Sequence, residues 1–373
     1  MRILILGTGA AQSDLIEFCK AMGFEVIGCS NSPDDKWIKK LDCYEYADIK
    51  DRQAVLEIAR KYNVDLIYTI GSAVAMPSVA EVSEKLGLPC FISVETAETC
   101  VSKERLRDLL GAEQEGNLQY EVYTGMEDAL TCSVFPAMMK PVDSQGQRGC
   151  FRVDSKEDIR KYFDLSLSYS PTGRVIIEEY VEGEEVSVNA YMQDGDLKLC
   201  IITDRITYDE FPGGIIREHR IPSRVISRPG RKDTAAKIRQ LVAHTADRLG
   251  IKNGPAYFQI IVRNNGDPAL IEADARLDGC HLWRLIRYYC GIDLIDMALR
   301  HLTGNDCVDC TGMEGAETGY VLKFINEEPG KRFSSEKIDE SEAEYVCLYY
   351  DEGDIVIKKN GHYEKCGYII EKM

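Results

Sequence analysis

The chain has 373 residues, and its 45 lysines and arginines against 62 aspartates and glutamates give a formal net charge of −17. This length predicts two or three domains with an ample core. The acidic balance argues against binding to a nucleic-acid backbone, which requires a basic face. No apolar run approaches the roughly 20 residues of a membrane span. The 14 cysteines are scattered through apolar stretches, which predicts reduced thiols in a cytoplasmic protein.

Strands and helices alternate from the N-terminus to about residue 93. The expected strands cover residues 3–6, 25–29, 65–71 and 89–92, and the expected helices cover residues 14–22, 53–62 and 75–86. This short period is typical of a doubly wound α/β sheet. Because the first apolar run passes straight into a turn, we interpret it as a strand and not as a signal peptide.

The turn after this first strand is Gly7-Thr8-Gly9. It differs from the dinucleotide fingerprint, because Gln12 stands at the third glycine and no acidic residue closes the second strand. A pyridine-nucleotide oxidoreductase is therefore disfavoured. We expect the turn to serve another small ligand or only the fold.

The helix expected at residues 102–110 has Ser102 as its N-cap and Lys103 in its first turn. The helix dipole disfavours a cation at this end, so Lys103 indicates an anion nearby. An ordinary exposed lysine is the alternative interpretation.

A second lysine precedes a loop that contains glycines. An apolar segment ends at Lys140-Pro141, and the loop 144–149 follows it. Glycines let successive backbone N–H groups turn toward one anion, and the lysine adds a positive charge, as polyphosphate binding requires. The order of residues is not that of a Walker loop. A hairpin with a solvated lysine is the alternative.

Two further segments carry acidic residues at informative spacings. The strand 175–181 runs into an acidic turn at 182–185. Backbone groups of such a strand could bind the edge of an adenine ring, and a carboxylate of the turn could bind the ribose hydroxyls. A solvated turn is the alternative. The strands expected at 254–262 and 269–276 form a hairpin. Gln259, Glu272, Asp274 and Arg276 could share one face of it and form a Mg²⁺ site. A polar face with an Asp–Arg pair is the alternative.

Taken in order, these elements resemble the ATP-grasp superfamily, in particular the branch of carbamoyl-phosphate synthase and biotin carboxylase. The resemblance extends from Met1 to about Gly304. It implies a Rossmann-like α/β domain over residues 1–97 and an ATP-grasp domain of α+β type over residues 98–304, with a mobile lid at about 120–187. Residues 305–373 would form a small β-rich appendage, with short β-like segments at 320–325, 345–350, 355–359 and 368–370.

The resemblance also implies a role for each motif. The two lysines and the glycine loop would bind the phosphates. A hinge at Glu178, Glu179 and Val181 would read adenine, and Glu185 would hold the ribose. The residues with these nucleotide roles are Lys103, Lys140, Ser144, Gly146, Arg148, Gly149, Glu178, Glu179, Val181 and Glu185. Gln259, Glu272 and Asp274 would bind metal, and Arg276 would face phosphate or substrate.

The metal motif departs from the family pattern at two positions. Asp274 replaces the usual asparagine, and Gln259 replaces the usual acid, as it does in the carbamoyl-phosphate synthase branch. The site keeps two carboxylates and one amide, so Mg²⁺ binding is expected to survive, with Mn²⁺ as a substitute.

The family activates a carboxylate as an acyl phosphate, which a nucleophile then displaces. The resemblance therefore implies an ATP-dependent carboxylate–amine ligase that releases ADP and phosphate, with Lys140 and Arg276 as catalytic residues and two small molecules as substrates. Phosphorylation of a small carboxylate, as in carbamoyl-phosphate synthase, is one alternative. A protein that binds ATP without turnover is the other. The oligomeric state stays open, with a homodimer as one option.

Substrate residues are harder to assign. Arg205, Arg217 and His219 lie where relatives line the acceptor pocket, and His281 follows the metal strand. Each is equally well interpreted as a surface ion-pair partner or an ordinary polar residue. The pair Cys307 and Cys310 lacks the second close pair of a zinc ribbon, so a metal site there is disfavoured.

Overall fold

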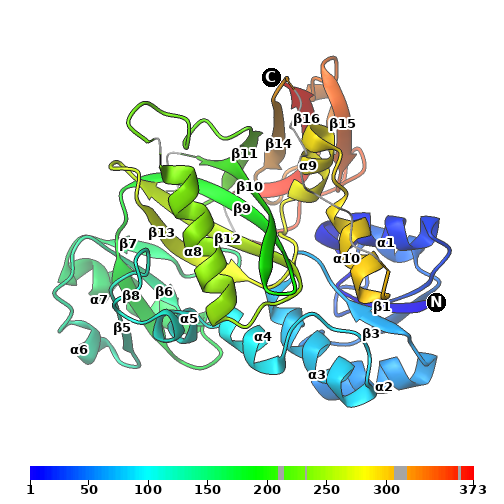
Figure 1. Ribbon diagram of the computed structural model, residues 1–373, viewed down its shortest axis with the longest axis horizontal. Helices are drawn as coiled ribbons and strands as arrows, with labels where there is room; N and C mark the ends of the chain where they lie inside the picture. The colour runs from blue at the N-terminus through cyan, green and yellow to red at the C-terminus, as the bar shows by residue number, and fades with distance from the viewer. Residues whose placement is uncertain (209–213, 232, 306–316, 360–362) are drawn as a thin grey trace.

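The computed structural model describes residues 1–208, 214–231, 233–305, 317–359 and 363–373 (Figure 1). Cys307 and Cys310 lie outside these ranges. No helix in the described ranges is long and apolar enough to cross a membrane. Within the same ranges, no group of three or more His, Cys, Asp or Glu side chains is arranged to hold a metal ion.

The N-terminal part is a parallel four-stranded sheet in the order β3-β2-β1-β4, as the strand–helix alternation predicts. Apolar residues 3–6 are fully buried in β1 because helices cover the sheet. The strands are β1 (Arg2–Leu6), β2 (Glu25–Ser30), β3 (Cys43–Tyr46) and β4 (Leu66–Tyr68), and the helices are α1 (Ser13–Ala21), α2 (Arg52–Tyr62) and α3 (Met76–Leu86). The predicted strand at 89–92 is wrong, because this segment has no regular structure.

A second, antiparallel sheet, here called the small sheet, has the order β5-β8-β6-β7. Its strands are β5 (Tyr120–Tyr123), β6 (Ala137–Pro141), β7 (Phe151–Val153) and β8 (Val175–Glu179). Helices α6 (Met126–Ala129) and α7 (Lys156–Ser168) pack on it around a separate apolar cluster that includes Ile159 and Phe163. Because this cluster is its own, the small sheet forms a unit beside the rest of the molecule (Figure 1).

The third sheet, here called the large sheet, has the order β13-β12-β9-β10-β11-β14-β16-β15. Its strands are β9 (Gly183–Gln193), β10 (Asp196–Thr207), β11 (Ile216–Ile221), β12 (Gly254–Arg263), β13 (Pro268–Asp274), β14 (Tyr320–Glu327), β15 (Ala343–Leu348) and β16 (Glu364–Lys372). The remaining α-helices in the described ranges are α4 (Val94–Cys100), α5 (Lys103–Leu110), α8 (Thr234–Arg248), α9 (Leu282–Cys290) and α10 (Leu294–Leu302).

The C-terminal strands do not form an appendage. β14 pairs with β11, with Lys323 opposite Glu218, so β14, β16 and β15 continue the large sheet. The expected strand at 355–359 appears only as an isolated bridge between Ile355 and Arg332. Sequence reasoning placed the β segments but not their partners, because pairing between distant strands leaves no local pattern.

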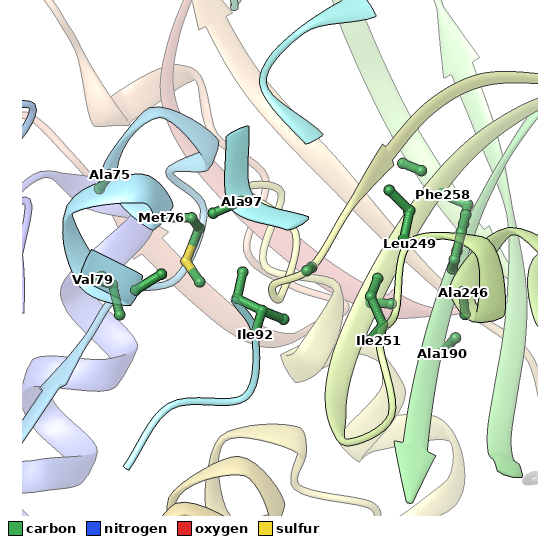
Figure 2. Packing of buried hydrophobic residues seen from close by; sticks show 14 of the residues in the cluster. Ala75, Met76, Val79, Ile92, Ala97, Ala190, Ala246, Leu249, Ile251 and Phe258 are labelled. Atoms are coloured by element: carbon green, nitrogen blue, oxygen red, sulfur yellow. The ribbon is translucent and has the colours of Figure 1, made fainter. Parts of the chain in front are cut away.

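One apolar core joins the N-terminal part to the large sheet. Figure 2 shows Met76 and Ile92 on one side and Leu249 and Ile251 on the other, with Phe258 of β12 beyond them. The expected domain boundary at residue 97 falls inside α4, which packs against both α3 and β13. The N-terminal part is therefore fixed against the strand that carries the metal motif.

Candidate functional site

A cleft of about 1110 Å³ lies between the small and large sheets and draws its lining from both of them. The predicted residues that line it are Lys103, Lys140, Ser144, Gly146, Arg148, Glu179, Val181, Glu185, Arg205, Gln259, Glu272 and Arg276. The predicted residues outside this lining are Gly149, Glu178, Arg217, His219, Asp274 and His281. Motifs separated by more than 170 residues in the chain thus meet in one cavity.

Lys103 connects helix α5 to the glycine-containing loop. Ser102 caps the helix by accepting a hydrogen bond from the Arg105 amide. The ammonium of Lys103 donates to the carbonyl of Ser144 at 2.9 Å, and its amide donates to the carbonyl of Val142 at 3.0 Å. The charge that the helix dipole disfavours is therefore directed at the loop where an anion is expected.

Lys140 lies at the end of β6 and belongs to a buried ion-pair chain. Its Nζ donates to Oε2 of Glu178 at 2.7 Å, while Arg107 Nε donates to Oε1 of the same carboxylate at 2.8 Å. Burial alone would raise the pKa of Glu178, but Arg107 and Lys140 together hold it at about 2. Glu178 is therefore an anion that holds two cations.

This arrangement changes the role expected for Glu178. Its backbone pairs with both β5 and β6 inside the small sheet, and its side chain is buried below the cleft. The hinge groups that do reach the cleft belong to Glu179, Tyr180 and Val181. Arg107 was not singled out from the sequence; its only signal is its position on the buried face of an amphipathic helix.

The loop after Lys140 takes backbone conformations that favour glycine. Gly146, Gln147 and Gly149 have φ values of 68°, 63° and 73°. A Cβ on Gly149 would lie 2.9 Å from side-chain atoms of Pro141 and Tyr169. Gly149 therefore lets the loop pack closely against these two side chains, and it does not face the cleft. The Gln147 side chain donates to the carbonyl of Gly214 near β11. The loop thus crosses from the small sheet to the large one.

Apolar side chains line the hinge end of the cleft. They come from the segment before β5, from β6, from the hinge and from the β12–β13 hairpin, and they are Leu118, Met138, Val181, Ile261 and Ile271. Apolar walls next to the hinge suit a planar heterocycle, because they bury its faces.

The metal motif has the predicted strand pairing. Gln259 of β12 lies opposite Glu272 of β13 in the antiparallel ladder. Gln259 donates to Oε2 of Glu185 at 2.9 Å, and Arg205 Nε donates to the same oxygen at 2.8 Å. Glu185, the expected ribose ligand, thus also holds Arg205.

Asp274 differs from the expectation in its orientation. It is buried and contacts Arg276 at 2.5 Å, which is the Asp–Arg pair that was the alternative to a metal site. Burial raises the pKa of Asp274 to about 8, with Glu272 adding to the rise and Arg276 opposing it. Its Oδ1 is buried and has no hydrogen-bond partner among the described residues. An orphaned oxygen close to a second carboxylate fits a hard cation, so the donor set suits Mg²⁺.

Three of the four expected substrate residues do not reach the cleft. The side chain of Arg217 is 47% exposed on the outer face. His219 is fully buried beside Phe324, and burial lowers its pKa well below the usual value. His281 is buried and bridges Asp14 and Tyr349. Arg205 alone of the four lines the cavity, because β10 turns it inward.

The C-terminal strand adds residues that sequence reasoning missed. Lys365 of β16 lines the cleft, with its Nζ 3.5 Å from the Cys280 sulfur and 3.7 Å from the centre of the Phe324 ring. Lys359 and Tyr363 line the cleft as well. No local motif marks these residues, and Lys365 reaches the cleft because β16 pairs with the distant strand β14.

The N-terminal turn has an internal partner. The Gln12 side chain donates to the carbonyl of Ile70 at 2.6 Å and accepts from the Gly9 amide at 3.2 Å. A Cβ on Gly7 would lie 2.9 Å from Gln12. The side chain that replaces the fingerprint glycine therefore fills the turn, which favours a role in the fold.

Comparison with known proteins gives a family match over part of the chain. Residues 133–282 match the ATP-grasp domain. Among curated proteins, the formate-dependent phosphoribosylglycinamide formyltransferase of Synechococcus sp. (strain WH7803) is 23% identical over 207 residues, which is 53% of each chain. The enzyme of the same name from Vibrio parahaemolyticus is 25% identical over 187 residues, 48% of each chain. The match therefore spans about half the length of these relatives.

Solved structures match over the whole chain. An L-amino acid ligase from Bacillus licheniformis has a TM-score of 0.80 at 18% identity, with 100% of this chain and 93% of that one covered. An N5-carboxyaminoimidazole synthetase from Staphylococcus aureus complexed with ADP has a TM-score of 0.78 at 15% identity, with the same coverage. At these identities the likeness concerns the fold. Residues 133–282 therefore match the ATP-grasp domain, and the whole chain has a mixed α/β fold similar to that of the ligase and the synthetase named above.

Proposed function

We propose that this protein is an ATP-dependent ligase that joins a carboxylate to an amine through an acyl phosphate and releases ADP and phosphate. The observation that carries the proposal is the meeting of Lys103, Lys140 and Arg276 with Glu272 and Gln259 in one cleft. Such a cleft would hold a polyphosphate and its metal ion side by side. The named relatives, a formyltransferase and two ligases or synthetases, are consistent with this reaction class.

Each group has a role that phosphoryl transfer requires. This reaction needs positioning and neutralisation of charge more than covalent help from the protein. Lys103 and Lys140 would neutralise the phosphates, while the loop 144–149 would cover them with backbone N–H groups. Arg276, held by Asp274, would meet the transferred phosphoryl group or the carboxylate that receives it.

ATP and Mg²⁺ are the proposed cofactors, with Mn²⁺ as a substitute. Glu272, Gln259 and Asp274 would hold the metal, which when bound neutralises charge on the phosphates. The apolar hinge end of the cleft would take adenine, next to the backbone of Glu179 and Val181. We also propose that the small sheet acts as a lid over the nucleotide, because its core is separate from that of the large sheet.

The acceptor end of the cleft suits an anionic small molecule. Arg205 donates to Glu185 through Nε, which leaves the other two guanidinium nitrogens for a carboxylate. A bidentate contact of this kind is strong and geometrically selective. An amino acid is the first member of the substrate pair to test.

The proposal predicts that phosphate release depends on a pair of substrates. Purified protein with ATP and Mg²⁺ is offered formate, bicarbonate, dicarboxylates and the amino acids, each alone and each crossed with a set of amines. We expect phosphate release only with a matching acid and amine, because the amine must displace the phosphate.

Each departure from this result has a definite meaning. Phosphate release that needs the acid but no amine would support the carboxylate-phosphorylating alternative. Release that is indifferent to every acid and amine would identify an ATP-binding protein with idle hydrolysis. Reactions without acceptor and reactions with boiled protein are the controls.

A further inference from the structure

Arg107 lies below the cleft at the junction of three elements. Its guanidinium donates to Glu178 Oε1 at 2.8 Å, to Asn117 Oδ1 at 3.3 Å and to the carbonyl of Ile271 at 3.0 Å. The side chains of Arg107 and Glu178 are both 0% exposed. A contact this well enclosed is not screened by water, so its geometry is strongly held.

Glu178 divides its two oxygens between two cations. Arg107 takes Oε1, and Lys140 donates to Oε2 at 2.7 Å. An ammonium has three N–H donors, so after this contact Lys140 keeps two for an anion in the cleft that it lines. The direction of those two donors depends on the position of the Glu178 carboxylate, and Arg107 fixes that position.

The third contact of Arg107 reaches the metal strand. Glu178 belongs to β8 of the small sheet, whereas Ile271 belongs to β13 of the large sheet and directly precedes Glu272. The Arg107 guanidinium on α5 therefore connects two strands. One is β8, whose Glu178 contacts Lys140, and the other is β13, which carries Glu272. Lys103, on the same helix, reaches the loop from the other end.

We propose that Arg107 is a positioning residue that acts through Glu178 to set the place of Lys140 relative to Glu272, and so sets the affinity for the phosphates of the nucleotide. Arg107 does not line the cleft and would touch no ligand. This inference rests on the proposed function, because it takes the anion beside Lys140 to be a nucleotide phosphate.

The test compares ligands with and without phosphates by isothermal titration calorimetry. Arg107→Met is expected to weaken binding of ATP with Mg²⁺ and of ADP at least tenfold, while adenosine affinity stays within twofold. Adenosine affinity is expected to change less than ATP or ADP affinity because adenosine has no phosphate to contact Lys140. A general loosening of the fold would weaken all three ligands alike and would overturn the proposal.

Arg105→Met is the matched control. Arg105 lies on the same helix two residues earlier, and its partner Glu98 is at the surface. Its replacement is expected to leave all three affinities unchanged. Loss of ATP affinity equal to that of Arg107→Met would attribute the effect to the helix and would contradict the specific role of Arg107.

A double-mutant cycle tests whether the effect passes through Lys140. In a Lys140→Met background, Arg107→Met is expected to cause no further loss of ATP affinity, because the group that it positions is gone. Additive losses would overturn the proposal. Failure of the unaltered protein to bind ATP would instead contradict the proposed function.

Two variants keep the test decisive if Arg107→Met does not fold, as judged by circular dichroism. Arg107→Lys keeps the charge but cannot reach Glu178 and Ile271 together, so we expect partial recovery of ATP affinity. The pair Arg107→Met with Glu178→Gln removes both buried charges and is expected to keep the tenfold loss. Full recovery in this pair would show that Arg107 only neutralises Glu178, and would refute positioning.

Discussion

Replacing Lys140 with methionine is expected to weaken ATP binding by about tenfold to a hundredfold, which corresponds to the loss of one charge-assisted hydrogen bond of about 1.5–3 kcal/mol. Turnover is expected to fall further, because the same ammonium would stabilise charge that moves during phosphoryl transfer. Methionine keeps the apolar stem of the buried side chain. Titration calorimetry with ATP and a phosphate-release assay measure the two effects.

The fold of this variant must be checked, because Glu178 loses one of its two ion-pair partners and keeps Arg107. Circular dichroism and a thermal unfolding curve report this. Lys161→Met serves as control, since Lys161 is an exposed lysine on α7 of the same small sheet. Unchanged ATP affinity and unchanged turnover in a folded Lys140→Met protein would contradict the assignment of Lys140 to the phosphates.

Replacing Glu272 with glutamine is expected to weaken Mg²⁺–ATP binding by about tenfold to a hundredfold, and metal-free ATP binding by much less. The reason is that Mg²⁺ relies on one or two carboxylates in addition to phosphate oxygens, and Glu272 is the carboxylate that both lines the cleft and faces Gln259. The measurement is a pair of ATP titrations, one with Mg²⁺ and one with a chelator.

Glu179→Gln is the matched control for this prediction. Glu179 is a cleft-lining carboxylate that pairs with Arg263 at 2.9 Å and belongs to the hinge. Its replacement is expected to change the two titrations by the same factor. If Glu272→Gln behaves like Glu179→Gln, Glu272 does not bind the metal.

The parts of the fold that could be predicted are those with a local signal. The apolar run of β1 predicts a buried strand, and the helical spacing of apolar residues in α2 predicts a helix with one buried face. β3 was missed because three of its four residues are only partly buried, the fourth is exposed, and the burial shows no alternation. The joining of β14 to β11 was missed because that pairing connects segments about 100 residues apart.

The site shows the same division between local and long-range information. Lys103, Lys140, Gln259 and Glu272 could be proposed from the sequence because short motifs mark them, and all four line the cleft. Arg107 and Lys365 were missed, since each acquires its role from partners that are far away in the sequence.

His219 and His281 were misassigned for a related reason. Burial decides their role, and a polar residue in a strand or before a helix does not reveal which way it faces. Asp274 fits both interpretations of its motif. It contacts Arg276, and within the described part of the chain its second oxygen has no hydrogen-bond partner.

The central claim is that a carboxylate of the substrate attacks the γ-phosphate of ATP. The direct measurement uses the productive pair with its carboxylate labelled with ¹⁸O, and mass spectrometry of the released phosphate. The account predicts ADP as the nucleotide product and one ¹⁸O atom in the phosphate, because the carboxylate oxygen stays with phosphorus when the amine displaces it. Label in AMP, together with release of pyrophosphate, would contradict it.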